Sequence, residues 1–111
     1  MTCWVMGANI LDEIMIPKEY KISHKQFGKK WGKHKHDYPN MNMEEYKKLI
    51  ENVFRNHDKI IYDKEKGEFY YISGEDLLRI KENGCFVSMY RGANSERVLR
   101  AIDNGGIVWQ K

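Results

Sequence analysis

The dipeptide Asn83-Gly84 lies between two short runs in which apolar and polar residues alternate. Asn-Gly is typical of a two-residue β-hairpin, because both central positions of a type I′ turn need positive φ angles. Such a turn fixes the strand register, so that residues whose numbers sum to 167 face one another. The sequence therefore predicts an antiparallel hairpin built from residues 77–80 and 85–90.

This register divides the hairpin into two faces. The face toward the core is expected to hold two pairs, Ile80 with Val87 and Leu78 with Met89. The opposite face is expected to hold three pairs: Lys81 with Phe86, Arg79 with Ser88, and Leu77 with Tyr90. Cys85 falls on the core face, which argues against a nucleophilic thiol.

The hairpin belongs to a longer series of strands. Residues 60–62 and 69–72 show the same period of two, and residues 107–109 can add an edge strand. The turn before residue 77 is less well defined, so either Tyr70 or Tyr71 could join the face that carries Arg79.

Helical periodicity precedes the strands. A first helix is expected between Ser23 as N-cap and Pro39, and a second follows Asn42, whose side chain can form a capping box with Glu45. The apolar face of the second helix is expected to comprise Met43, Tyr46, Leu49, Ile50, Val53 and Phe54. His57, just after this helix, is expected to cap its C-terminal end without a catalytic role.

A short helix over residues 95–102, with Leu99 and Ile102 as its apolar residues, is expected near the end of the chain. Residues 1–22 show no clear pattern. The sequence predicts one α+β domain over residues 1–111. In it, two N-terminal helices pack on a four- or five-stranded antiparallel sheet that is followed by a short C-terminal helix.

Composition excludes some classes of protein. The chain has 111 residues and a net charge of +3, which suits an acidic partner such as nucleic acid but does not require one. Aromatic residues make up 13% of the chain, and most of them are expected in the core. No apolar run reaches the roughly 20 residues of a membrane span, and the first residues lack a basic leader, so neither a membrane protein nor a signal peptide is expected. Cys3 and Cys85 are expected to be reduced thiols.

His34 has the most distinctive setting in the first helix. At 100° per residue, it borders an apolar stripe on one side and a cluster of charge on the other, whereas His36 points into solvent. The stripe consists of Phe27, Trp31 and Tyr38, and the charged cluster of Lys30, Lys33 and Asp37. One interpretation is a proton-transfer residue. The other is a helix-edge histidine that is hydrogen-bonded to Asp37.

Two glycines, Gly28 and Gly32, lie inside the same helix. Each costs about 1 kcal/mol relative to alanine. We therefore expect a packed strand or a ligand to approach the helix backbone at these positions.

Metal-free RNA cleavage is the chemistry that these residue types suit. The ribose 2′-OH is the nucleophile, so the protein needs proton-transfer groups, cations around the phosphate and aromatic faces for the bases. The expected catalytic residues are His34, Arg79, Ser88 and Tyr90, and the expected RNA-binding residues are Lys30, Lys33, Tyr71, Lys81 and Arg91. A solvated sheet face with no ligand is the alternative.

No cofactor and no metal ion are expected. The pair His34 and His36 could suggest a metal site, but side chains at i and i+2 of a helix point apart, and no cysteine or paired acid completes a ligand set.

Several short motifs together resemble the barnase–EndoU–colicin–RelE superfamily of small nucleases, in particular the C-terminal toxin domains of contact-dependent inhibition and related polymorphic toxin systems. The matching residues are Gly32, Lys33, His34, Asp37 and Tyr38; Asn56 and Asp58; and Gly84, Phe86, Val87 and Ser88. The resemblance covers roughly residues 24–92. Ser88 stands where threonine is commoner in the family.

The resemblance implies a metal-independent ribonuclease toxin, often directed at tRNA, with His34 and Ser88 in its site. It also implies a cognate immunity protein as partner, and a toxin domain that is secreted or delivered and then acts in the cytoplasm of a target cell. When free, the domain is expected to be a monomer. Two other hypotheses remain open: a non-catalytic RNA-binding module, and an immunity or regulatory protein.

Overall fold

The structure is a computed structural model that describes residues 15–111. Four helical segments lie within this range: α2 (His24–His34), the 3-10 helix η1 (Lys35–Asp37), α3 (Met43–Arg55) and α4 (Glu96–Asp103). Five strands follow or interleave with them: β1 (Lys59–Asp63), β2 (Glu68–Ser73), β3 (Asp76–Lys81), β4 (Phe86–Tyr90) and β5 (Ile107–Gln110). The predicted α+β class is confirmed.

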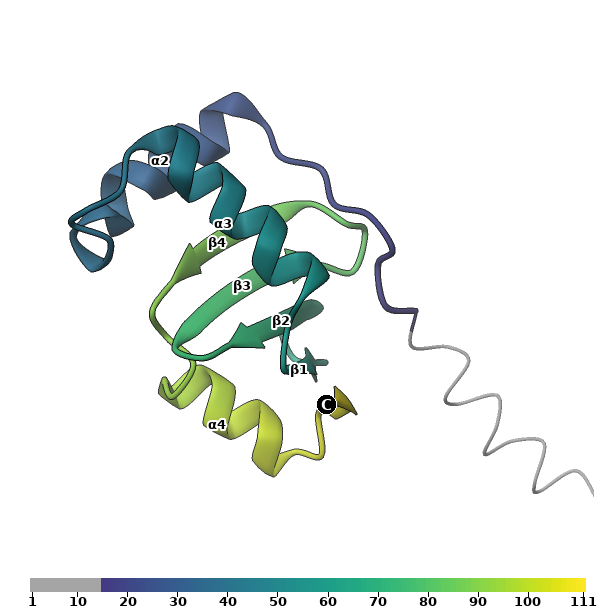
Figure 1. Cartoon of the computed structure of the whole chain (residues 1–111). Helices are drawn as coiled ribbons and strands as arrows, with labels where there is room; N and C mark the ends of the chain where they lie inside the picture. Colours follow the sequence, from purple (N-terminus) through teal and green to yellow (C-terminus); the bar gives the residue numbers. More distant parts are fainter. Residues whose placement is uncertain (1–14) are drawn as a thin grey trace, which may run out of the picture.

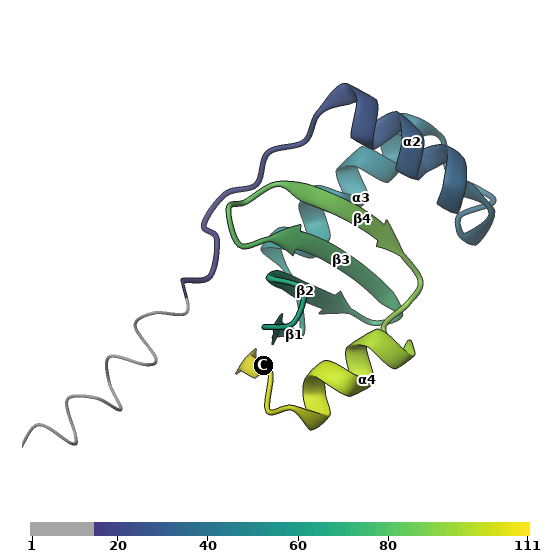
Figure 2. The ribbon, with the colours of Figure 1, turned by 180° about the vertical axis from the view of Figure 1, so that it is seen from behind.

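The strands form one antiparallel sheet in the order β4-β3-β2-β1-β5 (Figure 1). The helix α3 lies across one face of this sheet, in front of it in Figure 1 and behind it in Figure 2, and α4 packs on the other face. The C-terminal strand β5 pairs with β1 at one edge of the sheet, and β4 forms the other edge.

The helix α3 forms because its ends are capped and one side is apolar. The side chain of Asn42 accepts a hydrogen bond from the amide of Glu45, and the Glu45 carboxylate accepts one from the amide of Asn42, so the predicted capping box is confirmed. Four of the six predicted apolar residues are buried: Tyr46, Ile50, Val53 and Phe54. Met43 is 45% exposed, so its assignment to this face was wrong.

The larger core lies between α3 and the sheet. Its buried strand residues come from β1 to β4: Ile60, Phe69, Tyr71, Leu78, Ile80, Phe86 and Met89. Val108 of β5 packs against them while partly exposed. Tyr71 is 1% exposed, and the hydroxyl of Tyr46 donates to the carbonyl oxygen of Met89 at 2.5 Å. This side of the sheet is the core face that the hairpin pattern predicts.

A second core lies on the opposite face, where no core was predicted. Val98 and Ala101 of α4 pack there against Ile61, Tyr70, Ile72 and Leu77. The predicted apolar residues of this helix were in part wrong, because Leu99 is 49% exposed and Ile102 only half-buried. The face that carries Arg79 is therefore covered by α4 over part of its area.

The Asn83-Gly84 turn is present, but its type differs from the prediction. Lys81 and Cys85 close a three-residue loop, in which the amide of Gly84 donates to the carbonyl oxygen of Lys81 at 2.8 Å. Gly84 has a φ of 91°, and no non-glycine residue between positions 15 and 111 has a positive φ, so Asn83 cannot be part of a type I′ turn.

A β-bulge in β4 compensates for the extra loop residue. Ile80 pairs with Phe86, whereas Arg79 pairs with Ser88, so that Val87 has no partner on β3. Beyond the bulge, the predicted pairs Arg79–Ser88, Leu78–Met89 and Leu77–Tyr90 are confirmed. The pairs of Val87 with Ile80 and of Phe86 with Lys81 were wrong, and Phe86, 4% exposed, lies in the larger core.

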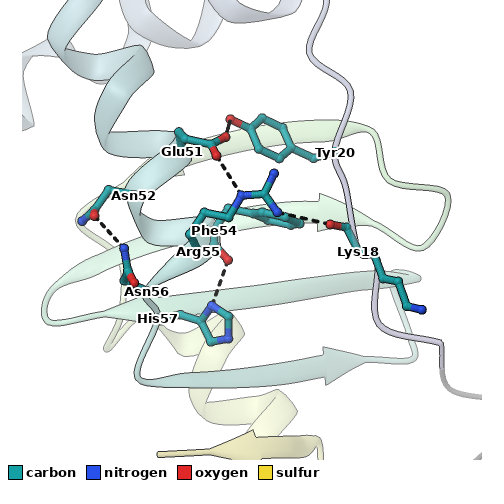
Figure 3. A network of polar contacts seen from close by, with 8 residues as sticks. All are labelled: Lys18, Tyr20, Glu51, Asn52, Phe54, Arg55, Asn56 and His57. Carbon is teal, nitrogen blue, oxygen red and sulfur yellow. Dashed lines mark hydrogen bonds and ion pairs between the residues drawn. The ribbon is translucent and has the colours of Figure 1, made fainter.

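Residues 15–22 lie along α3 and the start of β4. Lys21 forms a parallel bridge with Cys85, which is only partly buried, and the hydroxyl of Tyr20 donates to Glu51 at 2.8 Å. Figure 3 shows this network, in which Arg55 contacts both Glu51 and the carbonyl oxygen of Lys18. Cys3 lies outside the described residues.

The same figure shows how α3 ends. A ring nitrogen of His57, Nδ1, lies 3.0 Å from the carbonyl oxygen of Phe54 in the last turn of the helix (Figure 3). This contact has the geometry of the C-terminal capping interaction that the sequence predicts.

Candidate active site

The helix α2 packs against both α3 and the edge strand β4. Phe27 and Trp31 pack on the ring of Tyr46, with ring centroids 5.8 and 5.0 Å apart. The side-chain amide of Gln26 donates to the carbonyl oxygen of Val87 at 2.7 Å. Ser23 caps the start of this helix, as predicted. These contacts place the C-terminal end of α2 near the end of β4 (Figure 2).

His34, the last residue of α2, stacks on the ring of Tyr90, the last residue of β4. The two ring centroids are 4.6 Å apart, and the ring planes are inclined by 19°. Tyr90 packs against the second core beside α4, so the imidazole contacts the side of the sheet that carries Arg79 and Ser88. Sequence alone could not establish that α2 brings His34 to this face.

The surroundings of His34 favour its neutral form. Partial burial lowers the pKa of its imidazole below 6.5, and the positive charges of Lys33 and Lys30 lower it further, while Asp37 acts in the opposite direction. A neutral imidazole at pH 7 can accept a proton, which is what a general base must do.

Asp37 does not hold His34 in the way that the structural interpretation expects. Its Oδ1 lies 3.3 Å from Nε2 of His36, and its Oδ2 accepts a hydrogen bond from the amide of Arg91 at 3.2 Å. His36 is 74% exposed, in agreement with the helical projection. Asp37 therefore ties η1 to the end of β4, and its charge acts on His34 from a distance.

Arg79 is held by a carboxylate that the sequence did not single out, Glu68. Two hydrogen bonds, of 2.8 and 3.0 Å, join the guanidinium to both carboxylate oxygens, and the two side chains are 14% and 10% exposed. Tyr70 pairs with Arg79 across the strands, which makes Glu68 a diagonal neighbour of Arg79 on the same face. Glu68 could not be predicted as the partner of Arg79, because the sequence does not define the register between residues 69–72 and 77–80.

Lys30 lies within electrostatic reach of this pair. Burial lowers the pKa of its ammonium group, and the charges of Lys33 and Arg79 lower it as well, whereas Glu68 raises it. The candidate site is thus formed by His34, Tyr90 and Lys30 above the paired Arg79 and Glu68.

Ser88 lies beneath this site. It is 0% exposed, and its hydroxyl oxygen has no hydrogen-bond partner. The sequence interpretation expects the Ser88 hydroxyl at the surface, which is wrong. Ser88 is buried and pairs with Arg79 across the two strands.

Of the five expected RNA-binding residues, Lys30 is half-buried at the candidate site, and the other four divide into two groups. Tyr71 was misassigned, because it is buried on the α3 side, where its hydroxyl lies 3.3 Å from the carbonyl oxygen of Pro17. Lys33, Lys81 and Arg91 are exposed. The guanidinium of Arg91 lies 5.5 Å from the centre of the Tyr38 ring.

The two helical glycines do not mark a close approach of protein atoms. A Cβ atom built on Gly28 or Gly32 would have no neighbour within 4 Å. The expected packed strand was therefore wrong.

Among residues 15–111, no three His, Cys, Asp or Glu side chains are grouped closely enough to hold a metal ion. Over the same residues, no helix is both long enough and apolar enough to cross a membrane.

A comparison of the whole chain with models of known protein families and with curated proteins finds no match.

Proposed function

We propose that this protein is a metal-independent endoribonuclease that cleaves RNA by attack of the ribose 2′-OH. The observation that supports this proposal most strongly is the stack of His34 on Tyr90, which joins a neutral imidazole to a sheet face that carries basic side chains. Lys30 and Lys33 add positive charge near the same imidazole, where a phosphate group would be bound.

In the proposed reaction, a ring nitrogen of His34 takes the proton from the 2′-OH. The 2′-oxygen then attacks phosphorus, the bond to the 5′-oxygen breaks, and the leaving 5′-oxygen takes a proton from solvent, while the imidazolium of His34 returns its proton to solvent. The products are a 2′,3′-cyclic phosphate and a 5′-hydroxyl end. Lys30 and Lys33 neutralise charge that develops on the phosphate oxygens, as positioned cations do in phosphoryl-transfer sites.

Arg79 and Ser88 contribute from below. Two of the five guanidinium N–H groups of Arg79 donate to Glu68, so the other three can still donate to a phosphate. The carboxylate of Glu68 offsets most of the positive charge of Arg79. The unpartnered Ser88 hydroxyl retains its donor and acceptor capacity beneath the same site.

The substrate and partner proposals rest on the resemblance to toxin domains and on the basic charge of the chain. We infer RNA, with tRNA as the first candidate, and an acidic immunity protein that blocks the site in the producing cell. A net charge of +3 would speed association with such a protein. Action in the cytoplasm of a target cell follows from the same resemblance.

The test is incubation of the purified protein with total tRNA in EDTA. Discrete fragments that end in a 2′,3′-cyclic phosphate are expected, and a substrate with 2′-deoxyribose at the scissile position should remain intact. Binding without fragments would instead support an RNA-binding module. Cleavage of the deoxy substrate would contradict attack by the 2′-OH.

A further inference from the structure

Gly92 lies against the ring of Tyr90. A Cβ atom built on Gly92 would lie 2.3 Å from Cε2 and 2.8 Å from Cδ2 of that ring, and 3.3 Å from Cδ2 of Leu77. Distances below 3 Å are far inside van der Waals contact, so any larger residue at this position must displace the ring. Gly92 is itself buried.

The reason for glycine at this position is space rather than backbone conformation. The glycines with positive φ are Gly67, Gly74, Gly84 and Gly105, and Gly92 is not among them. Its φ is therefore one that other residues adopt without strain. What excludes a side chain is the ring of Tyr90.

Tyr90 thus makes two contacts that fix its ring. One edge of the ring meets the backbone of Gly92, and the imidazole of His34 stacks on it at 4.6 Å. The amide of Gly92 also donates to the carbonyl oxygen of Tyr90 at 2.9 Å, which holds the two residues in a tight turn.

We infer that Gly92 is a positioning residue, which sets the place of the Tyr90 ring and, through that ring, the orientation of the His34 imidazole. Its catalytic consequence rests on the proposed ribonuclease function, whereas the placement of the imidazole does not. A ring displaced by a side chain at position 92 no longer supports the stack. A shift of about 1 Å in a catalytic group can lower a rate by about 10²-fold.

The experiment follows the Cε1–H resonance of His34 by NMR, because an imidazole stacked on an aromatic ring carries a ring-current shift. The shift should persist in Tyr90→Phe, vanish in Tyr90→Ala, and be lost or strongly reduced in Gly92→Ala. The pKa of His34 should rise toward 6.5 in Gly92→Ala, because the imidazole becomes less buried.

A double-variant cycle separates positioning from a general effect on folding. In the Tyr90→Ala background, space for a Cβ atom is available. Adding Gly92→Ala there should leave the chemical shift of the His34 Cε1–H resonance unchanged. It should also leave the RNA cleavage rate within about twofold of the rate of Tyr90→Ala alone. This variant also serves if Gly92→Ala does not fold by itself. Gly28→Ala, with open space around its Cβ, is the matched control.

Two outcomes overturn the inference: an unchanged His34 resonance in a folded Gly92→Ala, or an equal effect of Gly92→Ala on that resonance with and without the Tyr90 ring. Absence of RNA cleavage by the unmodified protein would overturn the proposed function instead. The NMR arm would still decide the placement.

Discussion

The side-chain amide of Gln26 donates a hydrogen bond to the carbonyl oxygen of Val87, the bulge residue of β4. The bulge leaves Val87 without a partner on β3, and α2 uses its carbonyl oxygen to dock against the edge strand. Because His34 lies eight residues further along the same helix, this contact helps to set where the imidazole meets the sheet.

Loss of this hydrogen bond should weaken the docking of α2. Gln26→Ala should lower the free energy of unfolding by about 1 kcal/mol, the usual contribution of one hydrogen bond. Urea denaturation measures the difference. Lys29→Ala, at an exposed position of the same helix, is the control and should change stability by less than about 0.5 kcal/mol. Equal effects of the two substitutions would show that the Gln26 contact does not stabilise the helix.

Alanine at either helical glycine should stabilise the protein. Gly28→Ala and Gly32→Ala remove backbone freedom from the unfolded chain and meet no atom within 4 Å, so each should add up to about 1 kcal/mol to the free energy of unfolding. Thermal or urea unfolding measures this gain. A loss of RNA cleavage in a stabilised variant would instead indicate that RNA approaches the helix backbone at that glycine.

The pair of Arg79 and Glu68 should be sensitive to the loss of one partner alone. Arg79→Met leaves a nearly buried carboxylate without its partner and should cost about 3–5 kcal/mol. The double variant Arg79→Met/Glu68→Met leaves no unpaired charge and should recover most of that loss. Urea denaturation of the three proteins measures the coupling. Additive losses would contradict a buried pair.

The pH dependence should reflect the lowered pKa of His34. If the neutral imidazole is the base, cleavage should fall on the acid side with a midpoint below 6.5. Stability should change in the same sense: the unfolded chain binds the proton at higher pH than the folded protein, so the contribution of His34 is present above pH 6.5 and is lost as pH falls through its folded pKa. His34→Gln should remove this part of the acid destabilisation. A midpoint above 7 would contradict the assignment.

Local patterns predicted much of the fold. The capping box of α3, the strand periodicity and the pairing of Arg79 with Ser88 depend on neighbouring residues, and each is present. The pairing of Arg79 with Ser88 is correct only because two errors in the prediction cancel. A three-residue loop replaced the two-residue turn, and the bulge at Val87 restored the register. Whether a bulge forms depends on packing across the sheet, which one strand's sequence does not reveal.

The candidate site was harder to predict, because it depends on contacts between distant elements. Helical periodicity correctly placed His34 between apolar and charged neighbours, but only the docking of α2 on β4 brings it against Tyr90. The register between β2 and β3 determines both that Tyr71 is buried and that Glu68 pairs with Arg79. The sequence of the loop before β3 does not define this register. The position of α4 on the second face could not be foreseen, since its apolar surface is small.

The rate of tRNA cleavage by His34→Ala, compared with His36→Ala, tests the central claim most directly. Both substitutions remove an imidazole near the end of α2, but His36 is largely exposed and serves as the matched control. Loss of a general base lowers rates by about 10²–10⁴-fold. In EDTA, His34→Ala should therefore lose cleavage by at least about 10²-fold, while His36→Ala keeps nearly full activity. Undiminished cleavage by a folded His34→Ala would contradict the account.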